Sequence, residues 1–432
     1  MRAASNYQRA LAMLCFGVLA AGDFWRHLLS WWGWGALAVL VVTLAVVELV
    51  RMRVNLRRLP LSLFAFLGFM TLSISWALNP GAAALSAFGS VATTTVAALL
   101  AVSLSWQELL EVVSTTLRWI LGASLLFELF VATVIRHPVL PLWIDYSTLE
   151  KIPSTFYWSR ALLFEGGRIQ GIVGNANTLG ILSLLALIVF VSRLLARRGS
   201  PLWAWFWIAV ALLAFGLTRS ATVIVAAVAT LYVAAVVVLA RRVAGRARIA
   251  VLSGTAAVTV ALIVTAFLAR APLLRLLGRS SDLTNRVDIW QIVTEYAIQR
   301  PVAGWGWGFW APWTWPIEGF GKLNKIGYLS AHNAWLDVFL QLGAIGVVLL
   351  AVLVVGALIR SWSLAQELRS APYGSPLISW PLSATPLLLL TALLVQSLVE
   401  SQLLWEFGFA LLVIIAVKTG WRDPERAEAV AG

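Results

Sequence analysis

The sequence has little charge, few histidines and almost no cysteine, and each scarcity excludes a class of protein. Charged residues make up 12% of the 432 residues, about half the share of a typical soluble domain. The single cysteine, Cys15, excludes an intrachain disulfide and gives no sign of a thiolate metal site. The three histidines, at His27, His137 and His332, form no pair at helical spacing, and no DxD motif occurs, so no metal site is predicted. Without a GxxxxGK(S/T) phosphate loop or a dinucleotide-binding fingerprint, an ATP-driven machine is not indicated.

Apolar residues are what the chain has in excess, at 61% of the sequence. Runs of about 18 or more apolar residues are typical of membrane-spanning helices. About twelve spans are predicted, at 10–22, 34–50, 60–77, 82–104, 115–135, 171–192, 202–218, 220–240, 249–268, 331–359, 382–400 and 402–419. We therefore expect an all-α polytopic membrane protein in which residues 1–432 form a single transmembrane domain. The short first span follows a basic N-terminus, and a cleaved signal peptide would also explain it.

The distribution of basic residues predicts the orientation. Although the net charge is +13, the arginines cluster in short connections between apolar runs, which is typical of topology determinants and not of a nucleic-acid surface. With both termini in the cytoplasm, nearly all of these clusters lie on the cytoplasmic side of the membrane. Two long segments, 136–170 and 270–330, then lie outside the bacterial cytoplasmic membrane and form outer loops. The two halves of the chain do not resemble each other, which disfavours the inverted repeats of a secondary transporter.

Several polar side chains fall at the outer ends of the predicted spans. Arg168 precedes Asn175 and Asn177 where the sixth span begins; such a helix start binds anions, although an asparagine cap alone would also explain it. Arg219 occupies a tight outer turn, where a guanidinium can grip phosphate with two bonds or simply reach for the interface. Glu400, at the outer end of the eleventh span, is a candidate to orient a histidine or to pair with an arginine.

The outer loop 270–330 contains further candidate functional residues. An amphipathic helix is predicted at about 285–300, between the ninth and tenth spans and lying along the membrane interface, with Arg286 in its first turn. A cation at this end of a helix is unfavourable unless an anion lies nearby. A glycine- and tryptophan-rich run follows, and its flat rings suit a sugar or a lipid equally well. The tryptophans expected to make that contact are Trp305, Trp307 and Trp310.

His332 begins the tenth span, with Asn333 and Asp337 close behind it. An isolated histidine at an interface is usually without function. Here, however, arginines from three separate outer connections can reach the same face. We therefore predict that His332 is a catalytic base, with Asn333 among the supporting polar residues and with Glu400 or Glu128 available to orient the ring.

Taken in order, these motifs resemble the superfamily of O-antigen ligases and Wzy polymerases. The resembling pieces are Arg168 with 170–171 and 175–177, then 217–220, 285–290, 301–306 and 332–333, followed by Gly343 and Gly346. The resemblance implies a GT-C-like fold. It also implies transfer of a glycan from undecaprenyl diphosphate to an acceptor hydroxyl at the outer leaflet, with no metal, nucleotide or other cofactor.

By position, the resemblance makes Arg219 and Arg286 diphosphate-binding residues, with Arg168 a weaker candidate, and His332 the essential histidine. Gln341 is a departure, since the family often carries a glutamate there. A ligase and a polymerase share these motifs and differ in the acceptor, which would be a glycan, a lipid or a wall polymer. A secondary transporter for an anionic solute is the alternative from another class, because the same arginines would form its binding ring.

Overall fold

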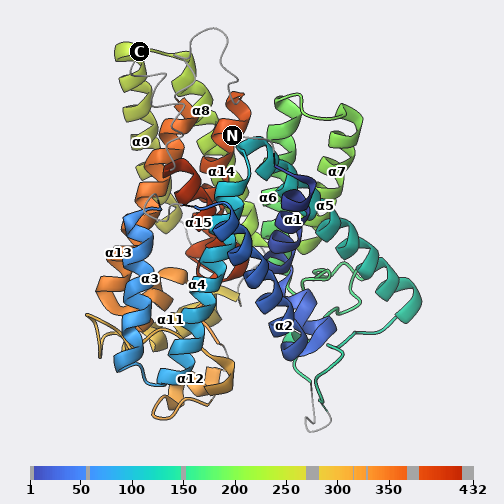
Figure 1. Ribbon diagram of the computed structural model, residues 1–432, viewed down its shortest axis with the longest axis vertical. Coiled ribbons are helices and arrows are strands. Elements are labelled where there is room, and N and C mark those ends of the chain that lie inside the picture. Colours follow the sequence, from blue (N-terminus) through green and yellow to red (C-terminus); the bar gives the residue numbers. More distant parts are fainter. Residues whose placement is uncertain are drawn as a thin grey trace.

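The computed structural model is all-helical over the residues that it describes, which are 4–54, 59–146, 152–268, 282–314, 316–326, 329–366 and 379–420. The first nine helices are α1 (Asn6–Ala20), α2 (Gly22–Arg51), α3 (Leu61–Leu72), α4 (Pro80–Ser103), α5 (Trp106–Phe130), α6 (Ala176–Leu195), α7 (Pro201–Thr218), α8 (Ala221–Arg242) and α9 (Gly245–Leu268). The remainder are α11 (Asp282–Ala297), α12 (Gly321–Ile326), α13 (Ala334–Gln366), α14 (Trp380–Ser397) and α15 (Glu406–Gly420). They form an upright bundle, with α11 and α12 gathered at its lower end in Figure 1.

Among the described residues, nine helices are long and apolar enough to cross a membrane. The predicted all-α membrane architecture is therefore confirmed, whereas the count of twelve is not. The three remaining predicted spans, the first, third and last, correspond to α1, α3 and α15, which have 15, 12 and 15 residues. A helix of 15 residues is about 23 Å long, less than the roughly 30 Å of a hydrocarbon core.

The core of the bundle is built around α15. Nearly all of its side chains from Phe407 to Val417 are shielded, and they pack against α4, α13 and α1. The outer helices, by contrast, turn large apolar side chains outward; Trp32, Leu202 and Leu231 are 89%, 81% and 70% exposed. Exposed apolar side chains around a buried centre are what a lipid-facing bundle requires.

Helix α13 is broken at Gly343, and the glycine- and tryptophan-rich run fills the break. Gly343 has φ 61° and ψ −163° inside the helix. The carbonyls of Leu340 and Gln341 accept hydrogen bonds from the amides of Trp305 and Gly306, while the amides of 344 and 345 donate to the carbonyls of 301 and 302. The run thus satisfies the backbone groups that the break leaves open, as a broken membrane helix requires.

Substituting Gly343 with alanine should destabilise the protein strongly. The backbone conformation is open almost only to glycine, and a Cβ would lie 2.3 Å from the carbonyl carbon of Val302. Strain and overpacking together should lower the free energy of unfolding by on the order of 3 to 5 kcal/mol. Gly254→Ala is the control, because no atom lies within 4 Å of its Cβ position. Thermal unfolding of both variants in detergent tests this; equal melting temperatures would contradict it.

Two loop features differ from the sequence-based expectation. Helix α11 begins at Asp282, so Arg286 lies in its second turn and not in its first. The apolar stripe of α11, including Ile289, Val293 and Ala297, packs against the loop that follows it and the start of α13, instead of facing a membrane surface. The reason is that Phe309, Phe320 and neighbouring rings of the same loop already supply an apolar partner.

Candidate active site

Glu400 is the centre of a polar network at the end of the bundle where α11 lies. It is 7% exposed and lies in the connection between α14 and α15. One carboxylate oxygen, Oε1, accepts hydrogen bonds from Arg286 at 2.5 Å and from Nδ2 of Asn177 at 2.7 Å. The other, Oε2, lies 3.2 Å from Nδ1 of His332. Residues from α6, α11 and the start of α13 therefore meet on one carboxylate.

Neighbouring residues of the same connection fix the position of Glu400. The hydroxyl of Ser401 donates to the buried carboxylate of Asp337 on α13, which also accepts from the amide of Ala331. Gln402 reaches Thr178 on α6 at 3.4 Å. The connection that carries Glu400 is thus tied to α6 and α13, two of the three elements that meet at its carboxylate, which limits the freedom of that group.

Arg168 joins the network through Asn177. Its Nη2 donates to Oδ1 of Asn177 at 2.5 Å, and its Nε donates to the carbonyl of Thr218 at 2.9 Å. The hydroxyl of Ser220 donates to the same Asn177 oxygen at 2.9 Å. Asn177 therefore links the Arg168 segment and the α7–α8 turn to Glu400.

Arg219 lies between these two bonded neighbours, yet its own side chain is exposed. It ends α7 in the left-handed conformation, with φ 46°. Within the described parts of the chain, no side chain forms an ion pair or a hydrogen bond with the Arg219 guanidinium. A cation held in a tight turn beside a polar network, with no carboxylate of its own, suits an anionic ligand.

Three helices start at this network. Asn177 is the second residue of α6, Ser220 immediately precedes α8, and His332 lies two residues before α13. Helix N-termini carry a partial positive charge and unpaired amide groups. Together with Arg168, Arg219 and Arg286, these helix starts give the site a strongly positive character.

The network also gives the two ring nitrogens of His332 different surroundings. Burial opposes ionisation of Glu400, but the hydrogen bond and charge of His332 and the charge of Arg286 hold the pKa of Glu400 below its ordinary value. An ionised carboxylate only accepts hydrogen bonds, so Nδ1 of His332 is the donor to Glu400. When the ring is neutral, this bond places the proton on Nδ1 and the lone pair on Nε2; when the ring is charged, both nitrogens carry a proton. His332 adopts φ 47°, a conformation that few residues other than glycine take up and that is often found at functional sites.

The lowered pKa of Glu400 predicts how its contribution to stability depends on pH. Above the ordinary pKa of about 4.3 the carboxylate is ionised in both folded and unfolded chains, so its contribution is fully present. As the pH falls further, the unfolded chain takes up the proton first, and the contribution is lost through the lowered folded pKa. Removing one partner of a buried pair costs on the order of 3 kcal/mol. We expect Glu400→Gln to lower the melting temperature at pH 5, and the gap to wild type to shrink at pH 3.5. A gap that stays constant would contradict the assignment.

The remaining predicted residues have structural positions near the site. Asn175 caps α6, accepting from the amides of 177 and 178, and Asn333 caps α13, accepting from the amides of 335 and 336. Glu128 does not reach His332, because it accepts from Ser159 and from the amides of 170 and 171. It holds the segment before α6 against α5.

The predicted tryptophans separate into two kinds. Trp307 is fully buried and stacks on Trp405 with ring centroids 5.4 Å apart, and Trp310 is 4% exposed. Trp305 is half-buried and lies under the guanidinium of Arg300, 4.1 Å from the ring centroid. Of the three, only Trp305 keeps appreciable exposed area.

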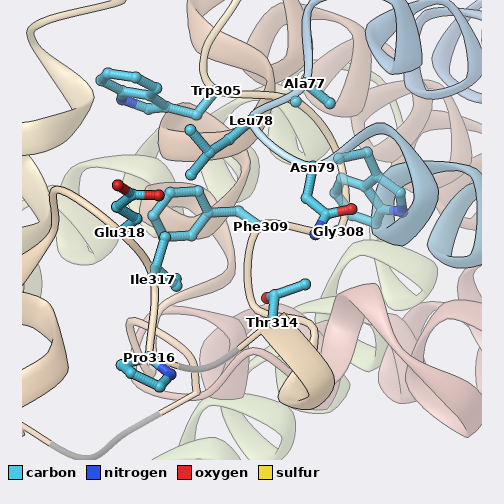
Figure 2. Close-up of a pocket in the computed structure, with 12 residues that line it drawn as sticks. Ala77, Leu78, Asn79, Trp305, Gly308, Phe309, Thr314, Pro316, Ile317 and Glu318 are labelled. Carbon is cyan, nitrogen blue, oxygen red and sulfur yellow. The ribbon is translucent and has the colours of Figure 1, made fainter.

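A cavity of about 300 Å³ lies where Trp305 meets the connection between α3 and α4. Figure 2 shows the rings of Trp305 and Phe309 with Leu78 and Ile317, and the carboxylate of Glu318 among them. None of the three arginines or His332 lines it. Gly308, on its wall, is bonded to Gln341, nine residues along α13 from His332, or about 14 Å along a helix axis.

In the described part of the chain, no group of three or more His, Cys, Asp or Glu side chains is placed to hold a metal ion. The sequence alone predicts no role for Ser220, Ser401 or Gln402, and it marks Asp337 only as a neighbour of His332. Ser220 next to Arg219 and Ser401 next to Glu400 carry no sequence signal beyond that proximity.

A family model described as O-Antigen ligase matches residues 204–351. Over this part of its length the chain is similar to O-antigen ligases. The predicted resemblance is thereby confirmed, and with it an integral membrane protein of polysaccharide biosynthesis. No curated protein matches the chain.

The matched region contains three of the site residues, namely Arg219, Arg286 and His332. Arg168, Asn177 and Glu400 lie outside it and are joined to the site by the hydrogen bonds described above. The family implies a lipid-linked glycan donor and a glycan acceptor.

Proposed function

We propose that the protein transfers a glycan from undecaprenyl diphosphate to an acceptor hydroxyl at the outer face of the cytoplasmic membrane. The observation that carries this proposal is the arrangement around Glu400, which joins a histidine oriented by a carboxylate to a group of arginines. In this assignment His332 is the base, and Arg219 and Arg286 bind the diphosphate with help from Arg168. The network lies beside α11, at the end of the bundle that the charge distribution assigns to the outside.

The chemistry follows from these positions. With Nδ1 of His332 bound to Glu400, Nε2 takes the proton from the acceptor hydroxyl as its oxygen attacks the anomeric carbon. The bond from that carbon to the diphosphate oxygen breaks, and the negative charge that develops on the leaving group meets the arginines and the starts of α6, α8 and α13. A direct displacement of this kind inverts the anomeric configuration. The step uses no metal, and His332 and the arginines supply its proton transfer and charge neutralisation.

Ligase and polymerase differ only in the acceptor, so the proposal includes a Wzy-type polymerase as its alternative. A secondary transporter for an anionic solute would use the same arginines differently. The orientation of His332 by Glu400 favours a transferase over a transporter, because a site that only binds an anion needs cations but no oriented base.

The direct test uses purified protein in proteoliposomes with an undecaprenyl-diphosphate-linked glycan and candidate acceptors. Transfer should release undecaprenyl diphosphate in proportion to product. Product attached to a lipid core or wall polymer identifies a ligase, and lengthened lipid-linked glycan identifies a polymerase. Counterflow of a free anionic solute that depends on Arg219, without any release, would instead establish a transporter.

We assign the cavity beside Trp305 to the acceptor. A flat ring with a nearby carboxylate and small polar groups suits a sugar, whose faces are apolar and whose edge carries hydroxyls. Glu318→Ala should raise the KM for the acceptor about 10- to 100-fold, through loss of a hydrogen bond to a charged group, and should leave the KM for the donor unchanged. Glu295→Ala, which removes a carboxylate that is not part of the cavity lining and pairs with Lys322, is the control. Initial rates at varied acceptor and donor concentrations test this, and an equal effect on both KM values would rule it out.

A further inference from the structure

A second cluster of arginines lies at the opposite end of α6. Arg118 on α5, Arg193 on α6 and Arg198 in the α6–α7 connection line a pocket of about 170 Å³. Arg193 is sixteen residues from Asn177 on the same helix, or about 24 Å along its axis. The α6–α7 connection lies at the upper end of the bundle in Figure 1, away from α11 and α12. The charge distribution assigns this end to the cytoplasm.

The pocket has an excess of positive charge. Glu111 is the one carboxylate in its lining, against three guanidinium groups, which leaves a net charge of +2. Within the described residues, none of the three arginine side chains forms an ion pair or a hydrogen bond. The Nε atoms of Arg118 and Arg193 are buried without a partner. Buried donors without acceptors are costly, and an anion with several oxygens would satisfy them.

The N-terminus of α7 adds to the positive electrostatic potential of the pocket. Ser200 precedes α7 and lines the pocket, and its side chain makes no capping hydrogen bond. The amide groups at this helix end therefore lack a side-chain acceptor. A phosphate oxygen in the pocket would meet both this positive helix end and the guanidinium groups.

The surroundings of the pocket favour an anion that carries an apolar chain. Trp203 lines the pocket and is 51% exposed; Leu202 and Trp119, each next in sequence to a lining residue, are 81% and 75% exposed. Exposed tryptophans with arginines are typical of the level at which lipid head groups meet acyl chains. Basic pockets between membrane helices on the cytoplasmic side are suited to anionic lipid head groups.

We propose that this pocket, between α5, α6 and the start of α7, binds the phosphate head group of an anionic phospholipid of the inner leaflet. The phosphate oxygens accept from Arg118, Arg193 and Arg198, and the acyl chains lie along the exposed face of α7. The site is separate from the Glu400 network and does not depend on the function proposed for it.

Native mass spectrometry of the delipidated full chain in detergent, with phosphatidylglycerol added back, tests the proposal. Wild type should bind one added phosphatidylglycerol molecule. The double variant Arg118→Gln/Arg193→Gln should bind it at least about tenfold more weakly, because it loses charge-assisted hydrogen bonds. Arg197→Gln, a neighbouring exposed arginine outside the lining, should match wild type. Phosphatidylcholine, which has no net charge, should not replace the retained lipid.

Each arm of this experiment has a deciding outcome. Equal phosphatidylglycerol binding by wild type and the double variant would overturn the proposal. Complete displacement of the lipid by millimolar inorganic phosphate would identify a free-phosphate site and overturn the lipid assignment. If the double variant elutes as an aggregate, Arg198→Gln decides in its place, because that side chain is exposed; it should weaken binding severalfold, and unchanged binding would refute the proposal.

Discussion

His332→Gln is expected to reduce glycan transfer by about 10²- to 10⁴-fold, the range that general base catalysis contributes. Glutamine can still donate to Glu400 but has no basic nitrogen, so the network should remain while proton removal is lost. Binding of the lipid-linked donor should therefore change less than threefold. Transfer rates and donor binding, measured on the same protein preparation, check the two parts separately.

His137→Gln is the matched control for this variant. His137 is exposed in the segment after α5, and its ring nitrogen contacts only the neighbouring carbonyl of Pro138. It should retain wild-type transfer. Full transfer by His332→Gln would remove His332 from the mechanism, whereas loss of donor binding together with transfer would give it a structural role.

Arg219→Gln is expected to lower kcat/KM for the donor by about 10- to 100-fold, the effect of losing one charge-assisted contact. This arginine is the clearest test of diphosphate binding, because its guanidinium has no partner among the described side chains. Arg286→Gln is harder to interpret, since that change also breaks the ion pair with Glu400. Steady-state rates at varied donor concentration provide the measurement.

Arg136→Gln is the control for Arg219→Gln. Arg136 also follows a helical segment in the left-handed conformation, with φ 58°, and is exposed. The two variants therefore share the backbone conformation and the loss of charge. They differ in position and in one exposed hydrogen bond, which Nε of Arg136 donates to the carbonyl of Thr133 at 2.8 Å. Equal effects would show that the change acts through overall charge, and the diphosphate assignment of Arg219 would be withdrawn.

Much of the fold could be predicted from the sequence because apolar length alone locates a membrane helix. The predicted spans agree with the observed helices within a few residues at most boundaries. The predicted 115–135 span shows where this fails, since α5 begins at Trp106. A capping box formed by Ser105 and Glu108 marks that start. Arg118 therefore lies in the middle of α5 and not near its start, which places it beside Arg193 and Arg198.

The residues of the candidate site could be predicted from the sequence, but the hydrogen bonds that join them could not. His332, Arg286 and Glu400 each stand out as polar residues at an outer helix end. That one carboxylate serves both of the others depends on how α14 and α15 are placed, and hydropathy contains no such information. The same limit applies to Trp307. A tryptophan in a loop is expected to be exposed, and its burial depends on Trp405, which lies almost a hundred residues later in the sequence.

The three helix starts around Asn177, Ser220 and His332 have a consequence for how the site tolerates change. Each contributes about half a positive charge from the backbone, and no substitution or change of pH removes it. Arginine variants should therefore lose donor capture gradually, down to a residual level set by the main chain. Under the proposed function, a change of any one of these side chains would weaken binding of the diphosphate without abolishing it, so the side chains can be replaced one at a time.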